Sequence, residues 1–143
     1  MLNKISLVVM AILSLFTYIY FNGFDTNTAV EKPIKFSNSI YAAVDSADQS
    51  INKATVEGHK ATSQEILQIR NAQTKFETME TIYKKLSAKS DTSSFHDISE
   101  ALKDLANYLE NSDQASLDRY NLLYEPAKRQ ILEYAGQLKE MGL

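Results

Sequence analysis

The first 24 residues carry the longest apolar run of the chain. Residues 5–21 contain no charged side chain, and they are bounded by Lys4 on one side and by Asn22 and Gly23 on the other. As a helix, this stretch would cover roughly 25 Å, which is close to the hydrocarbon thickness of a bilayer. The pattern therefore predicts a transmembrane anchor over residues 1–24.

The flanks of this run predict its orientation and its processing. Positive charge at the α-amino group and Lys4 favours a cytoplasmic N-terminus, which would place the rest of the chain across the membrane. A cleavable signal peptide is the alternative, but in Phe21-Asn22-Gly23 a phenylalanine stands where a cleavage site needs a small residue. A later site near Asn27-Thr28-Ala29 would lie far from the apolar run. We predict a protein of the bacterial inner membrane with its C-terminal domain in the periplasm or outside, or a periplasmic or secreted protein if the segment is cleaved.

Beyond the anchor, residues 25–36 predict a linker, because they mix turn formers with polar residues and contain Pro33. From residue 37 the apolar positions follow a helical period of alternating four and three residues. The first part of this seam consists of Ile40, Val44, Ala47, Ile51, Ala54, Gly58 and Ala61, and the second of Ile69, Ala72, Phe76, Met79, Tyr83 and Leu86. A skip in the seam, together with the helix-weakening Gly58, predicts a break near residues 55–62.

The second half of the chain predicts two further helical segments after a loop at residues 89–94. Ser94 is the expected N-cap of a short helix whose apolar stripe is Ile98, Leu102, Leu105 and Leu109. Asn111 and Gln114 predict a capping box that opens the last helix. Its seam consists of Leu117, Tyr120, Tyr124, Ala127, Ile131, Tyr134, Leu138 and Met141. Pro126 lies within this seam and predicts either a kink or a break.

These segments predict an all-α fold in which residues 37–143 form one domain after the transmembrane helix. The two halves could pair as a long antiparallel hairpin or, with a break near Gly58, as a bundle of three to four helices. We expect the bundle, because a hairpin would leave a set of apolar side chains poorly covered; dimerisation is the other way to cover them. The set comprises Ile66, Leu67, Ile82, Leu122, Leu123 and Leu132.

Composition argues against several classes of chemistry. The net charge is −3 with both signs interspersed, which offers nucleic acid no basic surface. The chain has no cysteine, which excludes disulfides, thiol nucleophiles and thiolate metal sites. His59 and His96 lie far apart without a metal-binding spacing, and Asp97, Glu100 and Asp104 share one helix face that we expect to be solvated. We predict no cofactor, no metal and no enzymatic activity.

Two classes of function fit this pattern. The first is a membrane-anchored protein that acts by protein–protein interaction, as an accessory subunit, an adaptor, an inhibitor or an immunity-type factor, with a protein partner or self-association. The alternative is a periplasmic bundle that senses or carries a small ligand. The candidate interaction or groove residues are Tyr108, Tyr120, Tyr124 and Tyr134. Aromatic residues at this spacing are more commonly core residues whose hydroxyl groups reach the wet edge.

Overall fold

The computed structural model describes residues 35–86 and 91–143, which form four helices and no strand. The helices are α2 (Phe36–Ala54), α3 (Ser63–Leu86), α4 (Ser93–Asn111) and α5 (Gln114–Glu140). The helical class and the bundle form are thereby confirmed for this part of the chain. The predicted anchor and nearly all of the predicted linker lie outside the described residues. Within the described ranges, no helix combines the length and the apolar character needed to cross a bilayer.

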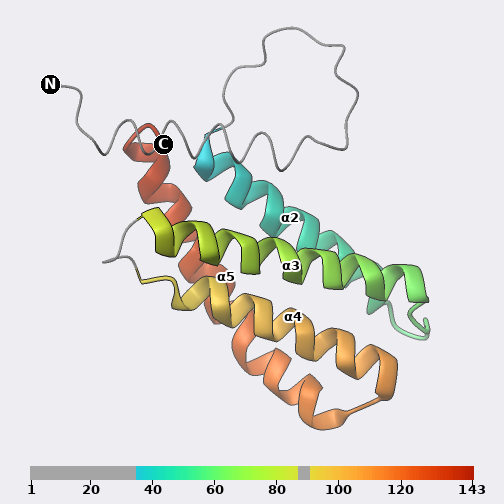
Figure 1. Ribbon diagram of the computed structural model, residues 1–143. Helices are drawn as coiled ribbons and strands as arrows, with labels where there is room; N and C mark the ends of the chain where they lie inside the picture. Colours follow the sequence, from blue (N-terminus) through green and yellow to red (C-terminus); the bar gives the residue numbers. More distant parts are fainter. Residues whose placement is uncertain (1–34, 87–90) are drawn as a thin grey trace, which may run out of the picture.

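Consecutive helices run antiparallel and close a ring (Figure 1). α2 packs against α3 and α5, and α4 packs against α3 and α5. We call the end where α2 begins and α5 finishes the terminal end. There the Ser37 hydroxyl donates to the carbonyl oxygen of Leu143 at 2.6 Å. We call the opposite end, which holds the α2–α3 and α4–α5 connections, the distal end.

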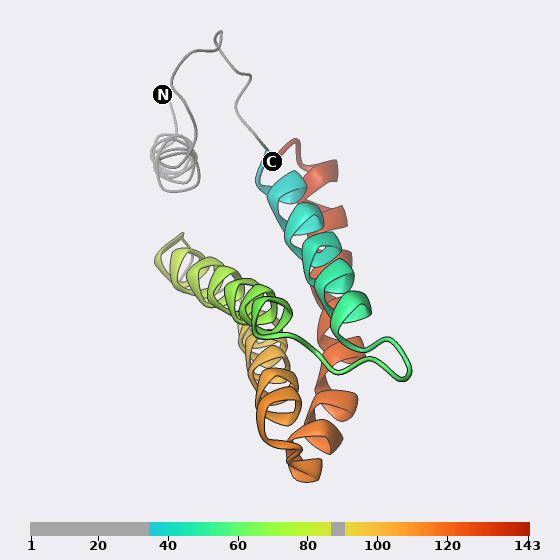
Figure 2. The same ribbon diagram turned by 90° about the vertical axis from the view of Figure 1, so that its right-hand side faces the viewer.

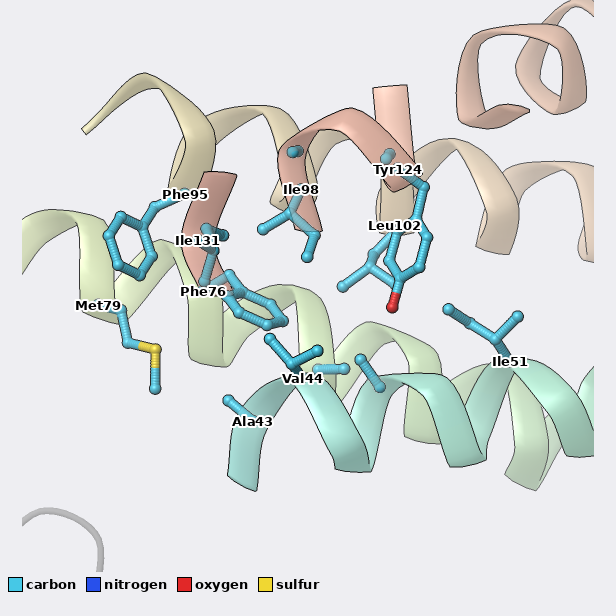
Figure 3. Close-up of a cluster of buried hydrophobic side chains, with 14 of the residues drawn as sticks. Ala43, Val44, Ile51, Phe76, Met79, Phe95, Ile98, Leu102, Tyr124 and Ile131 are labelled. Carbon is cyan, nitrogen blue, oxygen red and sulfur yellow. The ribbon is translucent and has the colours of Figure 1, made fainter. Parts of the chain in front are cut away.

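The core lies along the axis of the ring, where apolar side chains from all four helices point toward one another (Figure 3). Its central residues are fully buried, and they are Ile40, Phe76, Ile98, Leu102, Leu105 and Ile131. α2 contributes mainly small side chains, which let its neighbours approach closely, whereas α3 contributes larger ones. The bundle also buries Ile66, but Leu67 and Leu122 remain exposed.

The predicted break between the first two helices is confirmed, although its details differ from the prediction. α2 ends at Ala54, and Gly58 adopts a φ of 75° in the connection, which is a backbone conformation suited to glycine. Gly58 is exposed and interrupts the apolar seam after Ala54, whereas Ala61 is partly buried and packs against the core. A capping box starts α3: the Thr62 amide donates to Glu65 Oε2 at 2.7 Å, and the Glu65 amide donates to Thr62 Oγ1 at 3.2 Å.

The predicted caps of the last two helices were wrong by one or two residues. Ser94 is a buried residue inside α4, and Thr92 precedes the helix. Asn111 belongs to the last turn of α4, and Ser112 then takes a left-handed conformation with a φ of 57°. The cap of α5 is Asp113, whose carboxylate accepts from the Ala115 amide at 3.2 Å and from the Ser116 hydroxyl at 2.6 Å.

Two further expectations are corrected along α4 and α5. α5 is continuous through Pro126, so the alternative of a break there was wrong. Asp104 is only 7% exposed, whereas the sequence suggested a solvated face. It lies against α5, where Arg119 Nη2 donates to Asp104 Oδ1 at 2.7 Å and Arg119 Nε donates to Oδ2 at 3.1 Å. This paired, charge-assisted contact fixes the α4–α5 hairpin at the distal end.

Candidate functional site

The four candidate tyrosines do not form one groove, because the fold distributes them along the bundle. Tyr134 lies at the terminal end in an aromatic cluster with Phe36, Tyr83 and Phe95, which we call the terminal aromatic cluster. The Tyr134 and Tyr83 rings meet edge to face at 5.0 Å, and the Tyr83 and Phe95 rings stack at 5.3 Å. Burial raises the pKa of Tyr134 to about 12. This tyrosine therefore acts as a core residue.

Tyr124 lies midway along α5 and is also part of the packing. Its side chain is 3% exposed, and its hydroxyl donates to Asp48 Oδ1 on α2 at 2.8 Å. Lys128 Nζ lies 3.2 Å from Asp48 Oδ2 and 3.1 Å from Glu125 Oε1. Burial, and then the hydrogen bond to Asp48, raise the pKa of Tyr124 far above its ordinary value. The group ties α2 to α5 and leaves no free tyrosine hydroxyl there.

Tyr108 and Tyr120 are brought together at the distal end, where they line a cleft of about 430 Å³. We call this the distal cleft. It lies between the end of α2 with the residues that follow it, the end of α4 and the start of α5. We call its aliphatic lining residues the floor of the cleft; they are Ile51, Ala54, Leu105, Leu109 and Leu117. The remaining lining residues, mostly polar, are Thr55, Val56, His59, Tyr108, Tyr120 and Asn121.

The electrostatics of the distal cleft are close to neutral. His59 Nε2 lies 2.8 Å from Glu65 Oε2, so its imidazole is already paired with the carboxylate that caps α3. The hydroxyls of Tyr108 and Tyr120 form no hydrogen bond within residues 35–86 and 91–143. Burial, with smaller contributions from Glu125 and Asp48, raises the pKa of Tyr120 to about 12. The hydroxyl of Tyr120 is thus a neutral donor at physiological pH.

Sequence reasoning missed the contributions of α2 and the residues that follow it to this cleft. Val56 was not among the candidate residues, yet it lines the cleft and is 56% exposed. The sequence signal that could have identified Val56 is its position: it is an apolar residue in the predicted break, directly after the apolar seam of the first helix. A second hollow of about 280 Å³ between α2 and α3 was also missed; it is polar and includes Gln49, Lys53 and Asn71.

The lining of the distal cleft offers apolar contacts and neutral hydrogen-bonding groups. Among the residues described, no three His, Cys, Asp or Glu side chains gather in a way that could hold a metal ion. The distal cleft combines an aliphatic floor with hydrogen-bonding groups, and its volume falls within the range of roughly 300–1,000 Å³ that is typical of ligand sites.

No family model, no curated protein and no solved structure matches this chain.

Proposed function

We propose that the protein is a membrane-anchored, extracytoplasmic helical bundle that acts by binding another protein through its distal end. The observation that carries this proposal is the position of the distal cleft, which lies at the end of the bundle opposite the point where residue 35 enters it. The anchor itself is a sequence prediction, and the cleft gives the tethered domain a surface to present. An adaptor, accessory subunit, inhibitor or immunity-type factor would use such a surface.

The lengths of the helices support a presentation role. α2 has 19 residues and therefore rises about 28 Å from the terminal end to the cleft. Figure 2 shows α2 and α5 running side by side over this distance. A tether that joins the terminal end would hold the cleft at about this separation from the point of attachment. A partner could then approach the cleft without contacting the bilayer.

The two ends also differ in how far their apolar groups are already covered. Tyr83 and Phe95 are buried at the terminal end, whereas Val56 and the cleft beside it stay open at the distal end. Covering apolar surface releases about 25 cal/mol for each Å² removed from water. A partner that filled the distal cleft would therefore gain by covering its apolar lining.

A small-ligand sensor or carrier is the second candidate function, and the same cleft supports it. Its volume of about 430 Å³ and the two tyrosine hydroxyls without partners would suit a small molecule. The two functions differ in their need for the membrane. A chain that begins at residue 25 behind a cleavable signal should lose the activity of an anchored interaction protein, whereas a carrier should keep working.

The direct test is photocrosslinking in intact cells from single positions of the full chain. A photoreactive side chain at Val56 should yield an adduct with one specific protein. The matched controls are Leu122 and Met141, which are 73% and 71% exposed and lie outside the cleft lining. Equal adducts from all three positions, or none from Val56, would contradict the proposal. An adduct of twice the chain's mass would identify a second copy as the partner.

A further inference from the structure

We propose that the distal cleft recognises an uncharged apolar segment of the partner protein, whose peptide carbonyl groups accept hydrogen bonds from Tyr108 and Tyr120. This inference rests on the proposed function and names the chemistry of the partner. Three features of the cleft lead to this inference. They are its aliphatic floor, the two tyrosine hydroxyls that donate no hydrogen bond within the described residues, and the paired charges around it.

The floor selects apolar side chains. Ile51 and Ala54 of α2 line the cleft together with Leu105 and Leu109 of α4, so it presents apolar groups from two helices. An apolar side chain placed against them would be partly removed from water, which favours binding. A polar side chain would lose its water without gaining a partner from this floor.

The two tyrosine hydroxyls select a hydrogen-bond acceptor. They come from different helices, Tyr108 from α4 and Tyr120 from α5, and both line the cleft. Neither donates to another group in the described part of the chain. A peptide carbonyl is a neutral acceptor that every extended segment carries, so a partner backbone could satisfy both hydroxyls while its side chains reach the floor.

The charges nearby argue against a charged occupant of either sign. His59 is the only lining residue whose side chain can carry a positive charge, and it is already paired with Glu65. The carboxylates whose charge acts on Tyr120 belong to Glu125 and Asp48, and Lys128 pairs with both. An anion or a cation entering the cleft would therefore lose hydration without finding an unpaired counter-charge.

The position of the cleft argues for a different protein over a second copy. Two copies anchored in one membrane would point their distal ends in the same direction, away from their tethers. The exposed Met141 lies at the terminal end of each copy and could not reach a neighbour's cleft in that arrangement. The occupant is thus expected to come from the extracytoplasmic side. A Val56 adduct of twice the chain's mass would show that another exposed residue, such as Leu122, does reach it, and would overturn this choice of partner.

The test exploits the absence of tryptophan from the chain. The full chain is reconstituted in lipid nanodiscs and titrated with acetyl-Leu-Trp-Leu-amide, and the emission and anisotropy of the probe's tryptophan are followed. The matched probes are acetyl-Glu-Trp-Glu-amide and acetyl-Lys-Trp-Lys-amide, and empty nanodiscs measure partition into lipid. We expect the leucine probe to bind at least tenfold more tightly than either charged probe, because only its side chains suit the aliphatic floor.

Two sets of variants place the binding in the cleft. Tyr108→Phe and Tyr120→Phe keep the rings but remove the donors, and each should weaken the leucine probe roughly three- to tenfold. Val56→Glu puts a charge in the cleft lining and should weaken it at least tenfold, whereas Leu122→Glu should leave it unchanged. Equal binding of the three probes, or binding that all of these variants retain, would overturn the inference.

The outcome separates this inference from the proposed function. A specific crosslink from Val56 in cells, together with unchanged crosslinking in the Tyr108→Phe, Tyr120→Phe double variant, would leave the interaction function standing and refute the proposed chemistry. Absence of any protein adduct from Val56, together with selective binding of the leucine probe, would instead refute the partner and leave the cleft as a site for small neutral molecules.

Discussion

The two ends of the bundle differ in how completely side chains fill the space between the helices. At the terminal end, Phe36, Tyr83, Phe95 and Tyr134 come from all four helices and fill the space between them. At the distal end, the distal cleft stays open between α2, α4 and α5. The first end is built for stability, and the second keeps its apolar and hydrogen-bonding groups available.

Polar contacts nonetheless hold the helix ends around the distal cleft. The Asp104–Arg119 pair joins α4 to α5, the Arg70–Glu110 pair joins α3 to α4 at 2.6 Å, and the capping box of Thr62 and Glu65 starts α3. These polar contacts hold the helix ends in place without filling the space between them. An open site can therefore coexist with a fixed shape, which is what recognition without large reorganisation requires.

The largest test of this comparison is the truncation of one tyrosine at each end. Tyr83→Ala removes a buried ring that contacts three other aromatic side chains, and it should lower the free energy of unfolding by about 3–5 kcal/mol. Tyr108→Ala removes a half-buried ring at the open cleft and should cost about 1 kcal/mol or less. Urea denaturation followed by circular dichroism measures both. Equal losses would show that the two ends contribute alike.

The next test concerns the polar framework of the distal end. Asp104→Ala removes a buried carboxylate and leaves Arg119 without its partner on α4, so we expect a loss of about 1–2 kcal/mol; Arg119 is partly exposed and can regain water. Glu100→Ala, one turn earlier on the same helix, removes only an exposed pair with Lys103 and should change stability by less than about 0.5 kcal/mol. A similar effect of the two substitutions would place Asp104 on the solvated face that the sequence suggested.

These residues also show how far the sequence could predict the structure. The period of Ile40, Val44, Ala47 and Ile51 identified the buried face of α2, because a helix repeats every 3.6 residues whatever it packs against. The break before Thr62 was predictable for a similarly local reason, since Gly58 and its neighbours weaken a helix. Local rules identified most of the residues that face the core and the helical class, although Gly58 and Met141 of the predicted seams are exposed.

The site depended on information that is not local. Tyr108 and Tyr120 share a cleft while Tyr124 and Tyr134 do not, because the angle at which α5 crosses α2 and α4 decides what each turn faces. Asp48 and Tyr124 are 76 residues apart, and no spacing rule links them. The burial of Asp104 was missed for the same reason: Asp97 and Glu100 on the same face of α4 are partly exposed, but Asp104 lies where α5 returns past α4.

The third test compares two glycines, and the expected effects have opposite signs. Gly58 in the distal connection has a φ of 75°, so Gly58→Ala should destabilise the protein by about 1 kcal/mol although nothing would clash with the added methyl group. Gly136 lies inside α5 toward the terminal end, and a Cβ there would lie 3.8 Å from Tyr41 Oη, an ordinary contact. Gly136→Ala should stabilise the protein by about 0.5–1 kcal/mol. Thermal unfolding of both variants checks the pair, and effects of the same sign would contradict the account of the distal connection.

The smallest effect expected is on acidification, and it should appear first at helix starts. The hydrogen bond from the Thr62 amide, and then that with His59, lower the pKa of Glu65, and the Ser116 hydroxyl lowers the pKa of Asp113. A carboxyl whose pKa is depressed in the folded state contributes stability above its unfolded value, and this contribution is lost as the pH falls through the folded value. The unfolded values are near 4.5 for Glu65 and 3.8 for Asp113, so the loss should begin below about pH 4.5.

Hydrogen exchange of single amides between pH 5 and pH 3, corrected for the intrinsic rate, would detect this loss. The first turns of α3 and α5 should lose protection at the distal end, while amides beside the terminal aromatic cluster keep theirs. Asp91 provides the internal comparison, because bonds from Ser93 also lower its pKa and it lies before α4 at the terminal end. If the first turn of α4 opens with those of α3 and α5 while the amides around Tyr83 stay protected, the caps respond to acid and the aromatic cluster does not. Loss of protection around Tyr83 at the same pH would instead mean that the two ends unfold as one unit, and that the open cleft is as stable as the closed cluster.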